Sequence, residues 1–218
     1  MTYKEWKKLN PDIIQKRKEE KRMVKEKKMM EETPHYEPPY WPVIIAGFPG
    51  VGKTYAKEHC TKWGFKVVEL DTTPYLWKKN EESGKIQKIP GFPGNFYEDL
   101  LKILKDGQNT DVILVDAHSA VQKLLMDHHL KFVTVYPRKE CKEEYLRRHI
   151  RAGKPFAFVD SINENWDSLM EEALERARKG QDILFLGSDK YLDEDTILSI
   201  RMKYGALRAA AMVAMESL

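Results

Sequence analysis

The stretch GFPGVGKT, residues 47–54, constrains this chain more than any other part of it. Its spacing is G-x-x-x-x-G-K-[ST], and the four defining positions are Gly47, Gly52, Lys53 and Thr54. An apolar run over residues 43–46 predicts a buried strand before it, and residues 55–63 predict a helix after it. At such a turn, glycines let successive backbone N–H groups face an anion near the positive end of the helix dipole. The stretch therefore predicts a phosphate-binding loop.

The side chains of this loop have separate predicted roles. Lys53 is expected to reach the β- and γ-phosphates of a nucleotide, and the Thr54 hydroxyl is expected to complete a Mg²⁺ site. An ordinary glycine-rich turn would need neither of these two residues. The residues expected to bind the nucleotide are Gly47, Pro49, Gly50, Val51, Gly52, Lys53, Thr54 and Tyr55.

A second GFPG occurs at residues 91–94, but no Gly-Lys-Thr follows it. Asn95 is instead a good N-cap, and Glu98 stands three positions later, as in a capping box. An apolar helical pattern continues through residues 100–104. The second copy therefore predicts the start of a helix and no phosphate site.

Five apolar runs alternate with helical stretches along the chain: residues 43–46, 66–70, 111–115, 131–136 and 182–186. This alternation predicts right-handed crossovers and a parallel sheet that is covered on both faces. We expect an α/β fold, a three-layer α/β/α sandwich. Ligands of such sheets bind outside the carboxyl ends of the strands, so the residues that follow each run are the candidates for a site.

Two acidic residues occupy such positions. Asp116 directly follows the third run and fits the residue that orders Mg²⁺ through water in P-loop proteins, although a helix cap is the alternative. Asp71 follows the second run. His118 is interpreted as a polar loop residue, since a lone histidine carries little functional information. The stretch 127–129, Asp-His-His, is interpreted as a loop without a metal.

Arginines gather on the helix predicted after the fourth run. Arg147 and Arg151 are four positions apart and share a helix face, whereas Arg148 points elsewhere. Gly153 and Pro155 end this helix. Planar guanidinium groups suit a transferring phosphate, which makes all three arginines candidates, but pairing with the glutamates at positions 143 and 144 is an alternative role.

The N-terminal part of the chain differs in composition from the rest. Residues 1–32 hold 11 Lys and Arg against 7 Asp and Glu, a net charge of +4, and predict a solvated helical arm, residues 1–35. This arm is either a plain surface extension or a segment that binds nucleic acid or a partner. A proline-rich linker, residues 36–42, separates it from the main domain, residues 43–218. Within that domain, residues 196–218 predict a C-terminal helix that packs on the sheet or on another subunit.

Composition excludes several classes of protein. At 218 residues and 25.5 kDa the chain can bury a core of its own. No apolar run approaches the roughly 20 residues that span a bilayer, and the charged N-terminus is unlike a secretory signal. Cys60 and Cys141 lack metal-ligand spacing and are interpreted as reduced thiols. We therefore expect a cytoplasmic protein without a membrane partner.

Several segments together resemble the nucleoside monophosphate kinase branch of P-loop proteins, including small kinases of the kind found in bacteriophage genomes. They are GFPGVGKT, VVELD, VILVD, FVTVYP and EEYLRRHIRAG, and only the phosphate loop among them is highly specific. The resemblance covers roughly residues 42–190. It implies ATP and Mg²⁺ as cofactors, the strand order 2-3-1-4-5, and a lid near residues 147–165.

The same resemblance implies roles for the candidate residues. Lys53 and the lid residues Arg147 and Arg151 would act in phosphoryl transfer, and Arg148 would help to bind the nucleotide. The acceptor, a nucleotide or another small molecule, would bind over Asp71 and the segment that runs to Tyr97.

The sequence departs from the family where many members carry an arginine for the acceptor phosphate, soon after the second strand. Here Asp71 is followed by Thr-Thr-Pro-Tyr. A monophosphate acceptor needs positive charge and no base, whereas an alcohol gains from a nearby carboxylate. The first expectation is thus a nucleotide kinase. One alternative is a kinase for a hydroxyl on nucleic acid or a small metabolite with Asp71 as general base, and another is an NTP-binding switch or assembly factor without an acceptor.

Overall fold

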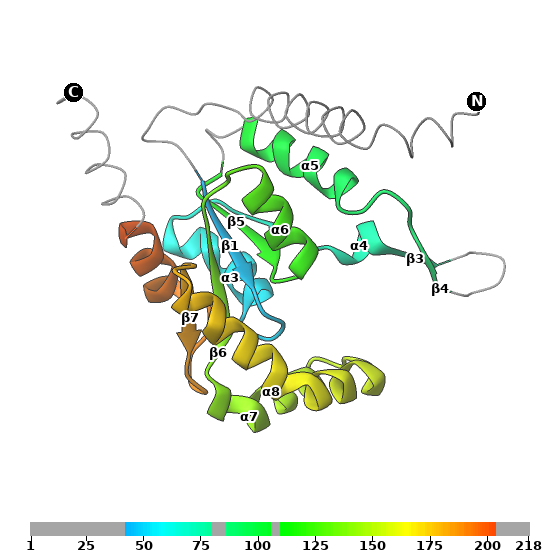
Figure 1. Ribbon diagram of the computed structural model, residues 1–218. Coiled ribbons are helices and arrows are strands. Elements are labelled where there is room, and N and C mark those ends of the chain that lie inside the picture. Colours follow the sequence, from blue (N-terminus) through cyan, green and yellow to red (C-terminus); the bar gives the residue numbers. More distant parts are fainter. Residues whose placement is uncertain (1–41, 80–85, 106–109, 204–218) are drawn as a thin grey trace, which may run out of the picture. The chain divides into compact units, whose positions relative to one another are not determined.

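The computed structural model describes residues 42–79, 86–105 and 110–203. All of them belong to the second of two units into which the chain divides, Tyr36–Leu218. The predicted N-terminal arm, the linker up to residue 41 and residues 204–218 of the predicted C-terminal helix lie outside the described residues, which Figure 1 draws in colour.

A five-stranded parallel sheet forms the centre of the described chain (Figure 1). Its strands are β1 (Val43–Gly47), β2 (Val67–Leu70), β5 (Val112–Asp116), β6 (Phe132–Pro137) and β7 (Ile183–Leu186). Each lies within one residue of the bounds expected from its apolar run, so the predicted α/β class with a parallel sheet is confirmed. The order across the sheet is β2-β5-β1-β6-β7, which is 2-3-1-4-5 when these strands are numbered among themselves.

Helices connect the strands. They are α3 (Lys53–His59) with its 3₁₀ continuation η1 (Cys60–Trp63), α4 (Thr73–Leu76), α5 (Gly94–Lys105), α6 (Ser119–Asp127), the 3₁₀ turn η3 (Lys139–Cys141), α7 (Lys142–Arg151) and α8 (Phe156–Arg178). Residues 194–203 form a further helical segment. As expected, α7 ends just before Gly153, which has a φ of 66°. After residues 152–155, α8 begins at Phe156, so most of the predicted lid range is helical.

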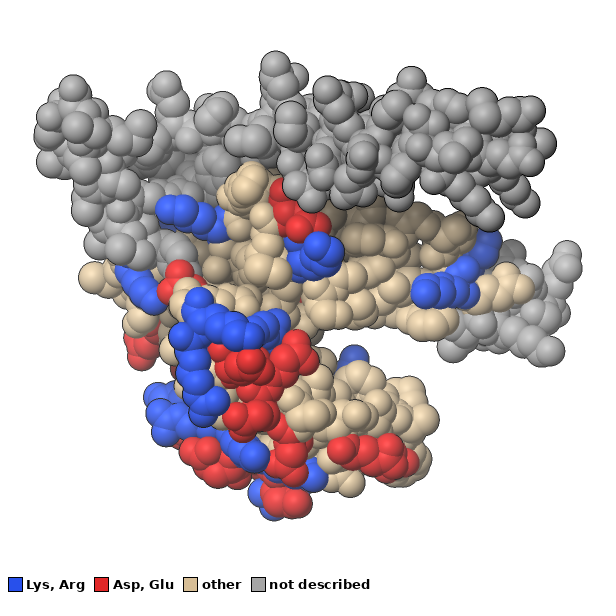
Figure 2. Space-filling view, in the orientation of Figure 1, with Lys and Arg blue, Asp and Glu red and all other residues tan. Residues whose placement is uncertain are grey.

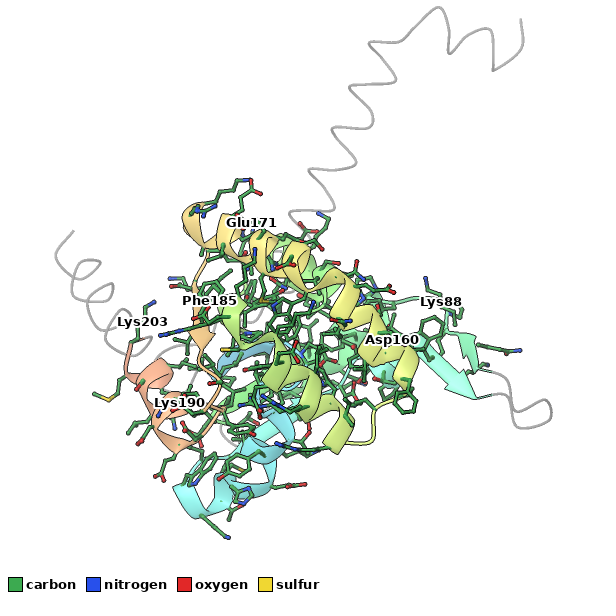
Figure 3. The ribbon with its side chains drawn as sticks, turned by 90° about the horizontal axis from the view of Figure 1, so that it is seen from below. Lys88, Asp160, Glu171, Phe185, Lys190 and Lys203 are labelled. Atoms are coloured by element: carbon green, nitrogen blue, oxygen red, sulfur yellow. The ribbon has the colours of Figure 1, made fainter. Side chains whose placement is uncertain are left out.

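Alternate residues of the strands face two different cores. Ile44 and Ala46 of β1 point toward α5 and α6, where they meet the buried side chains of Phe96 and Leu100. Ile45 points to the other face, toward Ala56 of α3 and, in the helical segment 194–203, Ile197 and Ile200. Figure 3 shows α8, labelled at Asp160 and Glu171, on the opposite side of the interior from α3. This arrangement is compatible with three layers.

The helix after the second GFPG starts earlier than predicted. Asn95 is not the N-cap, because α5 already begins at Gly94. The carbonyl of Pro93 accepts a hydrogen bond of 3.0 Å from the Tyr97 amide, which places the first turn of the helix before Asn95. The Asn95 side chain accepts instead from the amide of Phe96 at 2.9 Å. The predicted role of this segment as a helix start is otherwise confirmed.

A short antiparallel hairpin was not expected from the sequence. Its strands are β3 (Trp77–Lys79) and β4 (Ile86–Lys88), and Trp77 lies opposite Lys88. Neither strand shows an apolar alternation of useful length, which explains why sequence patterns do not reveal it.

The outer surface of α8 is charged with both signs. Ion pairs join Arg178 to Glu171 at 3.2 Å and Lys179 to Glu175 at 2.7 Å. Figure 2 shows red and blue side chains interleaved over the lower part of the molecule, where Figure 1 draws α7 and α8. Over the described residues, every helix is too short or too polar to cross a bilayer. Cys60 and Cys141 are buried and free.

Candidate functional site

The predicted phosphate loop connects the end of β1 to the start of α3. Gly50 and Gly52 have φ angles of 83° and 99°, in the left-handed region that favours glycine. A Cβ atom on Gly47 would lie only 2.9 Å from Val51 Cγ2, so the loop closes tightly on itself. These glycines form a turn that side chains would fill or strain. That geometry fits a cradle of backbone amides for an anion.

Distant parts of the chain hold this loop in place. The Phe48 amide donates to the Val135 carbonyl of β6 at 2.8 Å, and the Leu192 amide donates to the Val51 carbonyl at 2.8 Å. Tyr191 packs so closely that a Cβ on Gly52 would meet it at 3.1 Å. The loop is therefore braced from β6 and from the segment that follows β7.

Lys53 lies across the mouth of the loop. Its Nζ donates to the Gly47 carbonyl at 2.9 Å and lies 3.0 Å from Oδ1 of Asp116. The side chain is 11% exposed, so the ammonium group is largely withdrawn from water but faces the site. The structure thus brings the predicted phosphate ligand and the predicted metal residue together.

Asp116 ends β5 and is bound on its other oxygen by Thr72. Oδ2 accepts from the Thr72 amide at 2.9 Å and from the Thr72 hydroxyl at 2.7 Å. Burial acts to raise the pKa of Asp116, but the Lys53 ammonium and the two Thr72 hydrogen bonds outweigh it and hold the pKa below its ordinary value. Asp116 is therefore an anion at neutral pH. It does not cap α6, because His118 Nδ1 accepts from the Ala120 amide there at 3.1 Å.

A cavity of about 740 Å³ opens beside these residues. The phosphate loop, the carboxyl ends of β2 and β5, the end of α7 and one side of α8 line it. The lining residues include Pro49, Gly50, Gly52, Lys53, Thr54, Glu69, Asp71, Thr72, Asp116, His118, Arg148, His149, Arg151, Lys154, Phe158 and Tyr191. A volume of this size suits a small organic ligand. Lys53, Thr54, Asp71, Asp116, Arg148 and Arg151 therefore share one cavity.

Arg148 is the buried arginine of α7. Its Nη2 donates to the Ser188 carbonyl at 2.6 Å, and its Nη1 donates to the carbonyls of Gly50 and Lys190 at 3.1 and 3.2 Å. The guanidinium carbon lies 3.9 Å from the ring centre of Tyr191. Arg148 therefore joins α7 to the phosphate loop and to the segment that contains Lys190, which Figure 3 labels.

Arg147 and Arg151 are more exposed, and both approach Glu144. Arg147 Nε lies 3.2 Å from Glu144 Oε2, and Arg151 Nη1 lies 3.6 Å from Glu144 Oε1. Arg151 lines the cavity, whereas Arg147 is not among its lining residues. The glutamate pairing that the sequence offered as an alternative role is thus present in the structure.

The part of the cavity wall at the carboxyl end of β2 is acidic. Glu69 and Asp71 line it, and Asp71 Oδ1 accepts from the Thr73 amide at 2.8 Å. Within the part of the chain that the structure describes, no lysine or arginine from residues 66–78 lines the cavity. Glu69 forms an ion pair with Lys57 of α3, whose Nζ lies 3.8 Å from Glu69 Oε2.

Trp77, Phe92, Phe96 and Tyr97, four aromatic residues of the segment that follows β2, lie away from the cavity. Phe96 and Tyr97 are buried in the core between the sheet and α5. Phe92 packs edge-on against Phe96 and His118. Trp77 is exposed in the hairpin. None of the four is among the residues that line the cavity.

Sequence reasoning missed several lining residues: Glu69, Thr72, His149, Phe158 and Tyr191. Thr72 stands beside Asp71 at a strand end, the position that already singled out Asp71. His149 lies four positions after Tyr145, which is fully buried, and this spacing marks the inward face of α7. A buried aromatic at that spacing is the signal that could have identified it.

Comparisons with known proteins add little to this geometry. No protein-family model matches the chain, and no curated protein matches it. Among solved structures, the chain is similar to the crystal structure of APE1195, with 15% sequence identity and a TM-score of 0.37. The match covers 78% of this chain and 98% of that chain.

Proposed function

We propose that this protein is an ATP- and Mg²⁺-dependent phosphotransferase of the P-loop kinase type. One observation carries the proposal: the Lys53 ammonium and the Asp116 carboxylate meet 3.0 Å apart at the mouth of the glycine loop. A cation for phosphate oxygens and an anion for a metal are the two charges that phosphoryl transfer from a nucleotide requires. The order of the five strands and the resemblance of the loop to nucleoside monophosphate kinases support the same proposal.

Each residue then has a role in binding or orientation. The loop amides and Lys53 bind the donor phosphates, while Thr54 and Asp116 hold the metal. Bound Mg²⁺ supplies charge neutralisation for the phosphate oxygens. Arg151, at the cavity edge, neutralises charge that develops on the transferring group, with Arg147 as the second candidate for this role. Arg148 orients the phosphate loop through the Gly50 carbonyl.

The acceptor in this proposal is a nucleotide. A second candidate is a hydroxyl group on nucleic acid or a small metabolite, and a specific observation favours it: Glu69 and Asp71 make the acceptor side acidic. Acidic side chains repel an acceptor phosphate, whereas a carboxylate that accepts a proton activates an alcohol. Asp71 would be the base in that case. An NTP-binding switch without an acceptor would show hydrolysis or nucleotide-dependent partner binding alone.

A transfer assay with labelled ATP and Mg²⁺ tests the proposal directly. The full chain is incubated with nucleoside monophosphates, nucleosides, small alcohols and oligonucleotides that carry a 5′-hydroxyl group. We expect label on at least one acceptor, and about 10²- to 10³-fold slower labelling when Lys53→Ala replaces the wild type. Slow hydrolysis with no labelled acceptor in the panel would contradict the kinase and favour the switch.

A further inference from the structure

His149 lines the cavity and has a buried ring nitrogen without a hydrogen-bond partner among the described residues. Arg148 Nε, also buried, lies 3.5 Å from Glu144 Oε1, so His149 presents the neutral unpaired nitrogen beside the phosphate loop. The His149 side chain is 2% exposed, and among the described residues its Nε2 has no hydrogen-bond partner. An unpaired buried nitrogen costs free energy that a folded protein normally avoids. A ligand that binds in the cavity is one way to satisfy it, since His149 is part of the cavity wall.

The ring of His149 lies directly against Gly50. A Cβ built on Gly50 would lie 3.1 Å from Cε1 and 3.6 Å from Nε2 of His149. On its other side the ring meets Phe158 of α8 edge-on, with ring centres 5.2 Å apart. The apolar contact fixes the orientation of the ring, and Nε2 is left at the glycine turn where the donor phosphates are proposed to bind.

Positive groups dominate the surroundings of the ring. Lys53 faces it from the loop, Arg148 and Arg151 belong to its own helix, and Lys154 follows in the turn before α8. The acids that line this cavity are Glu69, Asp71 and Asp116, and Asp116 is already paired with Lys53. Phe158 and Ile162 of α8 bring no charge. Burial and the cations Lys154, Lys53 and Arg148 lower the pKa of His149, so the ring is neutral at neutral pH.

We propose that His149 binds a phosphate oxygen of the donor polyphosphate through Nε2 and takes up a proton when that polyphosphate binds. This inference rests on the proposed function. A polyphosphate brings several negative charges next to the ring and cancels the effect of the surrounding cations. The charged ring then donates a charge-assisted hydrogen bond, which is stronger than a neutral one. His149 is thus a positioning residue for the donor phosphates.

The sign of the pH dependence follows from this change. The proton-binding affinity of His149 is higher in the complex than in the free protein, so polyphosphate binding strengthens as pH falls between the two pKa values. One linked proton changes the binding constant by at most about tenfold for each pH unit. If His149 served only as packing between α7 and the loop, replacing it would change the stability of the protein. It would not change the number of protons taken up when polyphosphate binds.

Calorimetric titration of the full chain tests the inference without catalysis. The probes are the Mg²⁺ complex of the imido analogue of ATP and, separately, inorganic tripolyphosphate, each in buffers of different ionisation enthalpy. The variants are His149→Phe, which keeps the ring packing, and His149→Gln, which keeps an N–H donor. His129→Asn is the matched control, because His129 is exposed and has a φ of 54°, which asparagine tolerates.

We expect the wild type and the control to take up more protons per polyphosphate than either His149 variant at the same pH. His149→Phe should weaken both probes by about tenfold to a hundredfold, as for one hydrogen bond to a charged group. His149→Gln should weaken them less. Equal proton uptake by wild type and His149→Gln would overturn the inference and leave the proposed function standing. No binding of either probe by the wild type would overturn both.

Discussion

Lys53 Nζ and Asp116 Oδ1 lie 3.0 Å apart, so the proposed phosphate ligand and the proposed metal ligand neutralise each other directly. A nucleotide that drew Lys53 to its phosphates would remove the cationic partner of Asp116 and leave only its hydrogen bonds from Thr72. The carboxylate would then face phosphate oxygens of the same sign. A metal ion bound together with the nucleotide would restore the charge balance, and this would couple the binding of the two.

The first prediction is that Mg²⁺ strengthens nucleotide binding by about 5- to 150-fold, the usual range of coupling between two ligands. Asp116→Asn removes the carboxylate that repels metal-free phosphate, so the variant should bind the nucleotide about equally well with Mg²⁺ and with a chelator. Equilibrium binding of a fluorescent ATP analogue measures both affinities. A wild-type affinity that is indifferent to Mg²⁺ would contradict the coupling.

Lys53→Ala should lower phosphoryl transfer by about 10²- to 10³-fold, as expected when a preorganised charge is removed from a site. The fold should persist, because the hydrogen bond and the ion pair of Lys53 join it to Gly47 and Asp116 at the site, and Lys53 is not part of either hydrophobic core cluster of the described chain. Steady-state turnover and circular dichroism measure the two effects. Lys62→Ala, at an exposed position of η1, is the control. Near-wild-type turnover of Lys53→Ala would refute the assignment of the phosphate loop.

Asp71→Asn separates the two acceptor classes. The amide oxygen can still accept from the Thr73 amide, but the side chain can no longer take a proton. With a hydroxyl acceptor, turnover at saturating acceptor should fall by about 10²- to 10⁴-fold. With a monophosphate acceptor, whose attacking oxygen is already ionised, the loss should stay below about tenfold. Asp127→Asn, at the end of α6, controls for a general effect of charge.

Arg148→Ala should destabilise the protein by about 2–4 kcal/mol, because the carbonyls of Gly50, Ser188 and Lys190 lose their charged donor. Arg147→Ala on the same helix is the matched control. Its side chain is 60% exposed and pairs with Glu144 on the surface of the described chain, so we expect a change within about 0.5 kcal/mol. Urea denaturation gives both free energies of unfolding. Equal losses would mean that the Arg148 contacts contribute little.

The strands and the glycine-rich turn after β1 could be predicted because their signals are local. A strand buried on both faces is a short apolar run, and the motif fixes the residues of the loop. The orientation of the helix around Arg148 is an example of what local sequence patterns do not predict. Helical spacing separates Arg148 from Arg147 and Arg151, as predicted, but spacing alone cannot tell which face meets the loop. Packing of Tyr145 against Phe48 and Trp166 decides that, and it turns Arg148 and His149 inward.

The acceptor side is harder to predict for the same reason. Asp71 was identified by its place after a strand, but Thr72 holds Asp116 through a contact that spans 44 residues of sequence. The short hairpin of β3 and β4 depends on pairing between strands of three residues, which leave almost no periodic pattern. Contacts of this kind arise from the topology of the sheet and not from neighbouring residues.

The bracing of the phosphate loop by β6, by Arg148 and by Leu192 limits how freely the motif can be moved between proteins. Eight consecutive residues carry the motif, yet the groups that hold its carbonyls come from positions up to 141 residues further along the chain, from Val51 to Leu192. Transplanting GFPGVGKT into another strand-to-helix turn would transfer the residues without the supports. A transplant that retains anion affinity would have to carry equivalents of Arg148 and of the segment around Leu192.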